Sequence, residues 1–313
     1  MSPVIDEIDS SLDPSYDLTT IKVNLKYPKN NYVLNVLDLC PYSLKAKLAF
    51  EYKLLVCRDI EYWVSNWNPQ AIGNFCKLES RHGFNKFPQL KIQHQQSSEQ
   101  VWVNDSTEIL KTLDATFLEN SLFHEKNPAL SFEISLLEDW IDESFKIPFF
   151  CLQFLNKVNL DKSVMKWTAR EDGLIDNLKL KLYVQENINY LLSNFPNKDL
   201  ACSFAKKRFE EDLLPLVSDR LDCSNAQGAA FLTGNLLSAA DLGLYSFLKL
   251  LLNFEEAGLV NRRPTLLKFI AAIEGIPLGA IDGNSKSGNN RHKMVIVGNE
   301  APGHIKTAVG SLR

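Results

Sequence analysis

Residues 32–55 have the sequence YVLNVLDLCPYSLKAKLAFEYKLL, whose residue pattern changes from its first part to its second. The first part, Tyr32–Asp38, is rich in apolar and β-favouring residues and predicts a short strand. The second part, Ser43–Leu55, predicts a helix because its apolar residues have helical spacing, at Leu44, Leu48 and Leu55. A strand that leads into a helix through Cys40-Pro41 is therefore the starting point for the fold.

The segments that follow complete a small α/β unit. Ile60–Val64 is a second strand candidate, and strand, helix and strand within about 35 residues have the length of a βαβ unit, whose crossover favours parallel strands. Pro88–Gln93 and Gln100–Val103 predict two further strands, and the short polar connection between them indicates an antiparallel hairpin. Thr107–Phe117 predicts a helix that begins at an N-cap, Asp105. The predicted order is βαβ followed by ββα.

The remainder of the chain is helical in its patterning. Five segments carry apolar residues at spacings of three and four, namely Phe132–Phe145, Leu174–Phe195, Cys202–Val217, Ala239–Phe254 and Thr265–Ile273. The sequence therefore predicts an α/β domain with a four-stranded mixed sheet at 32–118, a linker at 119–127 and an all-helical domain at 128–277. The acidic segment 1–31 and the Gly/Asn-rich segment 278–313 predict a flexible arm and a flexible tail.

The composition is that of a soluble globular protein, with 313 residues of which 45% are hydrophobic and 23% charged. A net charge of −4 does not favour binding to nucleic acid. The longest nearly apolar stretches, Ile147–Leu155 and Leu244–Leu252, are much shorter than the roughly 20 residues that cross a bilayer, so we expect no membrane span. The acidic start of the chain has no signal-peptide core, which indicates a cytoplasmic protein.

The six cysteines are too scattered for a disulfide framework, and neither they nor the five histidines have the spacing of a metal site. We therefore expect reduced thiols and no bound metal. Five of the cysteines are expected to be small hydrophobic side chains without a chemical role, namely Cys57, Cys76, Cys151, Cys202 and Cys223.

Cys40 has a chemical context that the other cysteines lack. It lies where the predicted helix presents unpaired N–H groups, and these groups stabilise a thiolate, so we expect a lowered pKa and a nucleophilic sulfur. Pro41 suits the first helical turn because it has no N–H to lose. Ser43 stands where a dithiol enzyme has its second cysteine, so an external thiol would have to release any mixed disulfide. The alternative is an inert, packed loop cysteine.

Two further dipeptides have both a structural and a functional interpretation. Phe87-Pro88 opens the third strand, either as a trans proline at an edge or as a cis proline that sets the Phe87 backbone in an unusual orientation. Asp105-Ser106 opens the last helix of the domain, either as a plain cap or as a site for a ligand that carries both an ammonium and a carboxylate group.

Together these motifs resemble the glutathione transferase superfamily in their order and spacing. The Cys-Pro-aromatic-Ser form resembles the cysteine-type branch, which comprises the omega class, the dehydroascorbate reductases and the intracellular chloride channel proteins. The resemblance covers Tyr32 to about Pro277 and is carried by Cys40-Pro41-Tyr42-Ser43, Lys86-Phe87-Pro88-Gln89-Leu90, Asp105-Ser106-Thr107-Glu108-Ile109 and the capping box Ser238-Ala239-Ala240-Asp241.

The resemblance implies a thioredoxin-like, glutathione-binding first domain and a function as a glutathione-dependent thiol transferase. Cys40 would form and resolve mixed disulfides with glutathione, with Ser43 beside it. The second substrate would be a small electrophile or disulfide, and a homodimer is left open. The glutathione-binding residues would be Phe87 through its backbone, the cis Pro88, Asp105 and Ser106 at the γ-glutamyl end, and Lys86 at the glycyl carboxylate.

Some features depart from the family pattern. Asp105 stands where glutamate is more usual, Phe87 replaces a smaller aliphatic residue, and the arm and tail match nothing in the family. These departures favour an alternative, a non-catalytic interaction or scaffold protein that retains the fold. A second alternative is a membrane-inserting protein like the chloride channel branch, which the charges of Ser43–Leu55 disfavour. Asp142 and its acidic neighbours predict a solvated helix face.

Overall fold

The computed structural model of the chain describes residues 30–54, 62–66, 87–94, 100–168 and 177–276. The predicted tail, most of the predicted arm, and Lys86, Cys57 and Cys76 lie outside the described residues. None of the helices in these ranges is both long enough and apolar enough to cross a bilayer.

The first part of the chain forms a four-stranded mixed sheet with helices against it. Its elements are β1 (Asn30–Val36), α1 (Pro41–Leu54), β2 (Tyr62–Asn66), β3 (Gln89–His94), β4 (Gln100–Asn104) and α3 (Ser106–Thr116). The strand order is β2-β1-β3-β4, with β1 parallel to β2, β1 antiparallel to β3, and β3 antiparallel to β4. This confirms the predicted four-stranded mixed sheet, with its parallel βαβ pair and its antiparallel hairpin.

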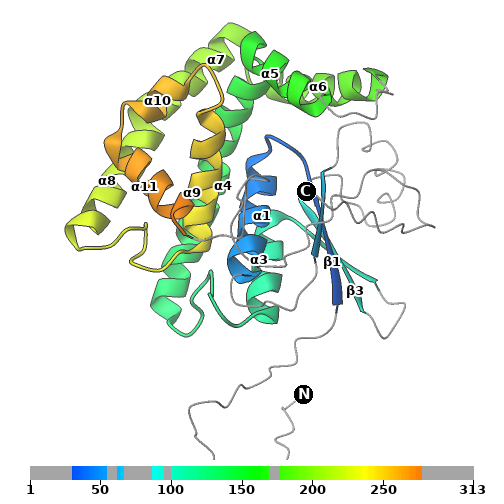
Figure 1. Cartoon of the computed structure of the whole chain (residues 1–313). Coiled ribbons are helices and arrows are strands. Elements are labelled where there is room, and N and C mark those ends of the chain that lie inside the picture. The colour runs from blue at the N-terminus through cyan, green and yellow to red at the C-terminus, as the bar shows by residue number, and fades with distance from the viewer. Residues whose placement is uncertain (1–29, 55–61, 67–86, 95–99, 169–176, 277–313) are drawn as a thin grey trace, which may run out of the picture.

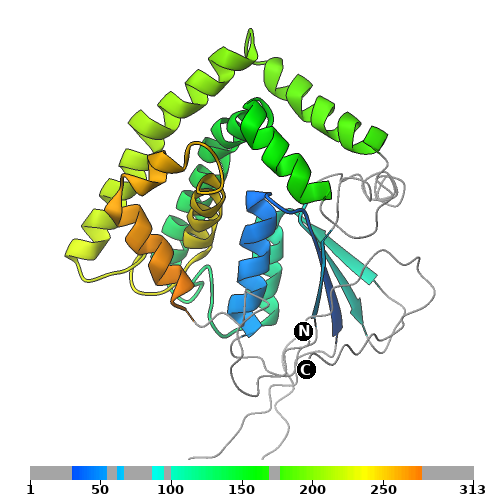
Figure 2. The ribbon, with the colours of Figure 1, turned by 45° about the horizontal axis from the view of Figure 1, so that its top comes forward.

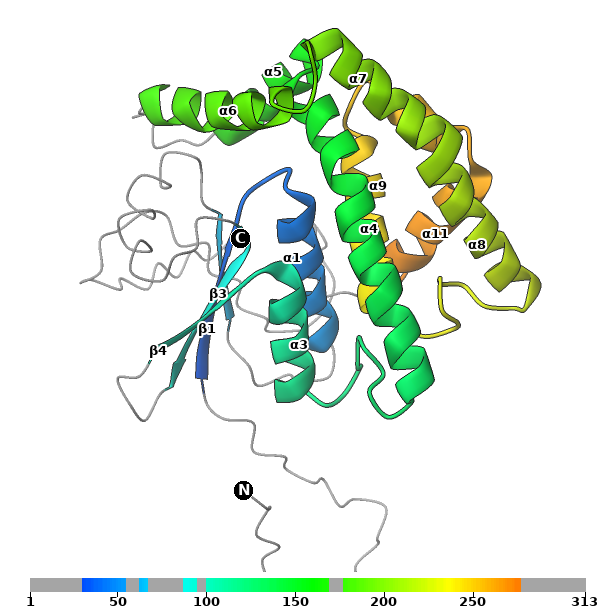
Figure 3. The ribbon, with the colours of Figure 1, turned by 180° about the vertical axis from the view of Figure 1, so that it is seen from behind.

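Helices α1 and α3 lie side by side between the sheet and the helices of the second domain (Figures 1 and 3). Alternate side chains of β1 point to them, since Tyr32 and Leu34 are buried. The ring of Tyr32 packs 6.2 Å from that of Phe50 on α1 and 5.7 Å from that of Phe117, directly after α3. The sheet is thus fixed to these helices by large apolar contacts, which are the main source of stability in such a layer.

The second domain is helical throughout. Its elements are α4 (Pro128–Phe154), α5 (Lys157–Thr168), α6 (Asn177–Leu192), α7 (Lys198–Lys207), the π-helix η2 (Arg208–Leu213), α8 (Leu214–Ala226), α9 (Ala239–Leu251), α10 (Ala257–Asn261) and α11 (Pro264–Glu274). Most of these helices gather on the side of α1 that faces away from the sheet (Figure 2). The fold class predicted from the sequence is therefore confirmed.

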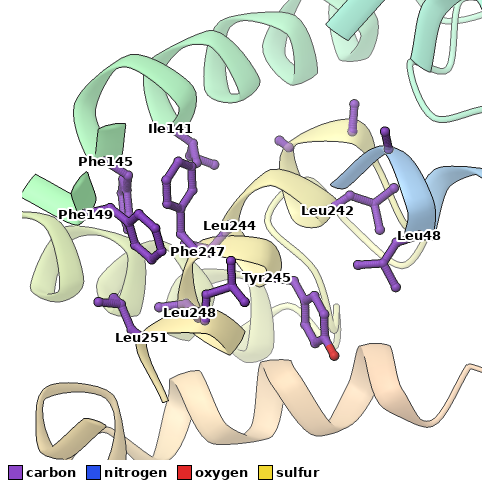
Figure 4. Close-up of a cluster of buried hydrophobic side chains, with 14 of the residues drawn as sticks. Leu48, Ile141, Phe145, Phe149, Leu242, Leu244, Tyr245, Phe247, Leu248 and Leu251 are labelled. Atoms are coloured by element: carbon purple, nitrogen blue, oxygen red, sulfur yellow. The ribbon is translucent and has the colours of Figure 1, made fainter. Parts of the chain in front are cut away.

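Helix α9 forms the centre of the second domain, with almost every side chain buried. Figure 4 shows its apolar residues surrounded by those of α4 and by Leu48 of α1. The ring of Phe247 on α9 lies 5.5 Å from the rings of both Phe145 and Phe149 on α4. Because α1 contributes to the same cluster, the two domains share one continuous core.

The predicted capping box starts α9. The Ser238 side chain accepts from the backbone N–H of Asp241, and the Asp241 carboxylate accepts from the backbone N–H of Ser238 at 2.9 Å. The same carboxylate also accepts from the backbone N–H of Leu232 at 2.9 Å, so it joins the preceding loop to the helix. Leu237 and Leu242, which flank the box at the positions of a hydrophobic staple, are both buried.

Four helical segments differ from the prediction, two of them near a proline. Helix α4 was expected to end at Phe145, yet it continues through Pro148, because Phe149 and Leu152 beyond the proline extend its buried face. The predicted single helix Cys202–Val217 is divided by η2, which ends two residues before Pro215. This proline has no N–H for the carbonyl four residues earlier. Helices α5 and α10 were not predicted, since α5 is mostly polar and α10 has only five residues.

Candidate active site at one end of the sheet

The strand register brings the three predicted segments to the same end of the sheet. Asn35 of β1 pairs with Gln89 of β3, and Gln89 pairs in turn with Asn104 of β4. Residues that follow β1, precede β3 and follow β4 are therefore neighbours. These residues are the ones that the sequence singled out, Cys40, Phe87-Pro88 and Asp105-Ser106.

Cys40 directly precedes α1, and its carbonyl accepts a hydrogen bond from the Leu44 N–H at 3.0 Å, as expected at a helix start. Its own N–H donates to the Leu37 carbonyl at 3.3 Å. The Ser43 hydroxyl oxygen is buried and accepts from the Leu37 N–H at 3.0 Å. Ser43 therefore closes the turn from β1 to α1 in addition to facing the sulfur.

The pKa of the Cys40 thiol is raised, which contradicts the expected lowering. Burial is the largest cause, and the charge of Asp142 adds to it. Hydrogen bonds from the Ser43 side chain and from the backbone N–H groups of Ser43 and Tyr42 act in the opposite direction, as predicted for a helix N-terminus, but they are outweighed. The sequence showed the helix start but not the burial that opposes it.

The peptide bond between Phe87 and Pro88 is cis, the second of the two interpretations of this dipeptide. Pro88 is buried and Phe87 is partly buried, packed against the core. The backbone of Phe87 therefore reaches the end of the sheet beside the turn that carries Cys40. Lys86 lies outside the described residues.

Asp105 is the N-cap of α3, and its carboxylate accepts from the Thr107 N–H at 2.9 Å. Its φ of 76° is in the left-handed region, which is unusual for a residue other than glycine and is found mainly where the surroundings fix the backbone. Ser106 is the first residue of α3 and is buried, whereas Asp105 is exposed. The exposed carboxylate lies beside the positive end of a helix, so this point offers groups for both ends of a zwitterion.

Tyr42 points away from this site and toward the helical domain. Its hydroxyl donates to the backbone carbonyl of Asp142 on α4 at 3.0 Å, and its ring lies 5.8 Å from that of Phe247. Burial, followed by the nearby charge of Asp142, raises the pKa of the Tyr42 phenol. Tyr42 is therefore a protonated phenol with its hydrogen engaged.

A buried charge cluster behind Tyr42 was not predicted. Lys45 on α1 forms ion pairs with Glu138 and, at 2.6 Å, with Asp142 on α4, and the Thr107 hydroxyl donates to Glu138 at 2.6 Å. The prediction that Asp142 lies on a solvated face is therefore wrong. Burial raises the pKa of Asp142 to about 6, although Lys45 opposes the shift. The spacing of four between the two carboxylates was the available signal.

The helical domain also supplies aromatic side chains near Cys40 that the sequence analysis did not identify. Tyr183 on α6 lies close enough for the charge of Cys40 to raise its pKa, although burial contributes more. Its ring lies 5.8 Å from that of Trp167 on α5 and 6.0 Å from that of Phe154 on α4. Within the described ranges, no three His, Cys, Asp or Glu side chains are grouped as metal ligands.

Comparisons with known proteins agree with this architecture. A family model described as "Glutathione S-transferase, C-terminal domain" matches residues 176–278. No curated protein matches the chain by sequence. Similar solved structures include glutathione transferase F7 from Populus trichocarpa, with 13% identity and a TM-score of 0.50 over 79% of this chain and 95% of that chain.

Two further structures have the same fold. FzlA from C. crescentus is 16% identical, with a TM-score of 0.53 over 79% of this chain and 89% of that one. A glutathione transferase family member from Pseudomonas fluorescens, with two glutathione bound, is 18% identical, with a TM-score of 0.50 over 82% of this chain and 92% of that one. The chain therefore has the glutathione transferase fold.

Proposed function

We propose that this protein is a glutathione-dependent thiol transferase of the cysteine type, similar to the omega and dehydroascorbate reductase classes. The observation that carries the proposal is the convergence of Cys40, the cis Phe87-Pro88 peptide and Asp105-Ser106 at one end of the sheet. The fold and the match of residues 176–278 support it, and the glutathione bound in the Pseudomonas fluorescens protein indicates the co-substrate.

Glutathione would bind across the three segments. Asp105 and the start of α3 at Ser106 would hold the ammonium and carboxylate groups of the γ-glutamyl end. The backbone of Phe87 would pair with the cysteinyl part, which places the glutathione sulfur near Cys40. Lys86 would meet the glycyl carboxylate.

The proposed reaction is two successive thiol–disulfide exchanges. The Cys40 thiolate attacks the glutathionyl sulfur of a mixed disulfide, the S–S bond breaks, and the substrate leaves as a thiolate that takes up a proton. Free glutathione, as its thiolate, then attacks the glutathionyl sulfur on Cys40, which releases oxidised glutathione and restores the Cys40 thiolate. Ser43 offers no second thiol, so the second exchange requires this external glutathione.

The environment of Cys40 supports a sulfur nucleophile more than a hydroxyl-type transferase. The Tyr42 hydroxyl donates to the Asp142 carbonyl and is not directed at a bound thiol. The Ser43 hydroxyl and the N–H groups of Tyr42 and Ser43 stabilise the Cys40 thiolate against the effect of burial. The second substrate would approach from the helical domain, beside Tyr183.

A second candidate function is that of a non-catalytic interaction protein with the same fold. The raised pKa of Cys40 favours it, because a thiol that stays protonated at neutral pH is a weak nucleophile. In that case the full-length protein would show a thiol pKa above the ordinary value in its alkylation profile and no retention on immobilised glutathione.

The proposal is tested by incubating the full chain with oxidised glutathione and locating the adduct by mass spectrometry. The expected adduct is on Cys40, and Cys40→Ser should abolish both the adduct and deglutathionylation of a small mixed disulfide. Cys223→Ser, which removes an exposed cysteine, is the matched control and should retain both. A Cys40→Ser protein with unchanged thiol transfer would overturn the proposal.

A further inference from the structure

The turn that carries Cys40 is held by two side chains from the helical domain. The indole N–H of Trp167 on α5 donates to the Asp38 carbonyl at 2.8 Å. The side-chain amide of Gln153 on α4 donates to the next carbonyl, that of Leu39, at 3.0 Å. Figure 3 shows α5 above the point where β1 leads into α1. Two consecutive carbonyls before Cys40 are thus fixed from a different domain.

The backbone between these contacts is in an unfavourable conformation. Leu39 has a φ of 59°, in the left-handed region that residues other than glycine rarely adopt. The hydrogen bond from the Cys40 N–H to the Leu37 carbonyl at 3.3 Å closes the turn around Leu39, and the Gln153 hydrogen bond fixes the Leu39 carbonyl in addition. A strained residue of this kind persists only where its surroundings determine the orientation of the peptide.

The two donors are themselves buried. Gln153 is 1% exposed and Trp167 is 3% exposed, so neither has bulk water as an alternative partner. The Trp167 ring is fixed between Phe154 and Tyr183, with centroid distances of 6.0 and 5.8 Å. Through these two hydrogen bonds, the turn is held in a fixed position relative to α4 and α5.

We propose that Gln153 and Trp167 are positioning residues that hold the Asp38–Leu39 backbone so that the Cys40 sulfur faces the first N–H groups of α1. Without them the Leu39 peptide would rotate to a negative φ, and the Cα–Cβ bond of Cys40, the next residue, would turn with it. The sulfur would then lose the N–H groups of Tyr42 and Ser43 that stabilise the thiolate. The helical domain thereby sets the reactivity of a thiol in the other domain.

This inference rests on the proposed function for its consequence in catalysis, but its test does not use glutathione. Cys40 in the full chain is alkylated with iodoacetamide between pH 6 and 10, and the rate at Cys40 is followed by peptide mass spectrometry. The variants are Trp167→Phe, which keeps a ring without the donor, and Gln153→Met, which keeps the length without the amide. Trp140→Phe is the matched control, because Trp140 makes no hydrogen bond to the turn.

The alkylation rate at pH 7 should fall by about threefold to tenfold in each variant, the effect of a thiolate that loses one hydrogen bond, and the midpoint of the profile should rise. Trp140→Phe should leave both unchanged. Leu39→Gly should restore the rate in the Gln153→Met protein, because glycine adopts a positive φ without support. Far-UV circular dichroism identifies any variant that does not fold. If one of the two variants does not fold, the alkylation profile of the other decides the test.

An unchanged alkylation profile in a folded Trp167→Phe or Gln153→Met protein would overturn the inference. So would a slower reaction that Leu39→Gly does not restore, because the effect would then not act through the Leu39 backbone. Failure of the proposed function is a separate result, namely thiol transfer that persists in Cys40→Ser.

Discussion

The ammonium group of Lys45 on α1 lies 2.6 Å from a carboxylate oxygen of Asp142 on α4 and also pairs with Glu138, one helical turn earlier. The Lys45 side chain is 1% exposed, so these ion pairs join the two domains within a low-dielectric interface. Burial raises the pKa of Asp142 to about 6, and the second negative charge, that of Glu138, acts in the same direction. This cluster makes Lys45 the charge on which the interface depends.

Lys45→Met should lower the free energy of unfolding by about 3–5 kcal/mol, because it leaves two buried carboxylates without a counter-ion. Urea unfolding at pH 7.5 measures the loss. The matched control is Lys111→Met, which removes an exposed lysine paired with Glu108 and should change stability by less than about 0.5 kcal/mol. Equal effects of the two substitutions would contradict the burial of the Lys45 cluster.

Glu51 on α1 should make stability fall as pH rises. Burial raises its pKa to about 7, despite Lys47 at 3.9 Å, and one of its carboxylate oxygens has no hydrogen-bond partner among the residues that the structure describes. The folded protein therefore keeps a proton that the unfolded chain releases near its ordinary pKa of about 4.3. The contribution of Glu51 to the free energy of unfolding is therefore complete below pH about 4.3 and is lost as the pH rises toward 7.

Glu51→Gln should remove the part of this dependence that Glu51 contributes, whereas the part from Asp142, whose pKa is also raised, should stay. We expect the variant to be more stable than the wild type by about 2–3 kcal/mol at pH 8 and equally stable at pH 4.5, as measured by urea unfolding at both values. Glu125→Gln, a change at an exposed glutamate, should leave the pH dependence as it is. A slope that is not reduced in Glu51→Gln would contradict this role of Glu51.

Asp241 should be the most sensitive polar position of the second domain. Its carboxylate is fully buried and accepts from the N–H groups of Leu232 and Ser238, both at 2.9 Å. Asp241→Ala would leave these donors unpaired and remove one half of the capping box of the central helix, at a cost of about 2–5 kcal/mol in urea unfolding. Asp199→Ala, in the exposed first turn of α7, should cost less than about 0.5 kcal/mol. A stable Asp241→Ala protein would contradict this role.

The features of the fold that arise from local patterning could be predicted from the sequence. The strand rich in β-favouring residues around Leu34 and the capping box at Ser238-Asp241 depend on residues close in the chain, and both are confirmed. The extent of α4 could not be predicted, because a proline such as Pro148 ends most helices. Only the packing of Phe149 against Phe247 on α9 shows why this helix continues.

The candidate site also combines local features, which the sequence shows, with contacts between distant residues, which it does not show. Cys40 and Asp105 are recognisable because each stands at a helix start, which is a local feature. The groups that set the properties of Cys40 are not local, since Gln153 and Trp167 are more than a hundred residues away in the chain. Lys45 likewise has its partners on α4, far away in the chain. The sequence predicted a lowered pKa for Cys40 from the helix start alone, whereas burial raises it.

Asp105 allows the cap and the proposed ligand contact to be separated by one atom. Asparagine caps a helix about as well as aspartate but carries no charge, so Asp105→Asn should keep the stability of the protein while it weakens glutathione binding by about tenfold to a hundredfold, the effect of losing one charge-assisted hydrogen bond to the ligand ammonium. Asp105→Ala should lose both properties. Isothermal titration calorimetry with glutathione and urea unfolding measure the two effects, and Glu108→Gln, at an exposed acid in the first turn of α3, is the control. If Asp105→Asn binds glutathione as tightly as the wild type, Asp105 is a helix cap and the ligand amine is held elsewhere.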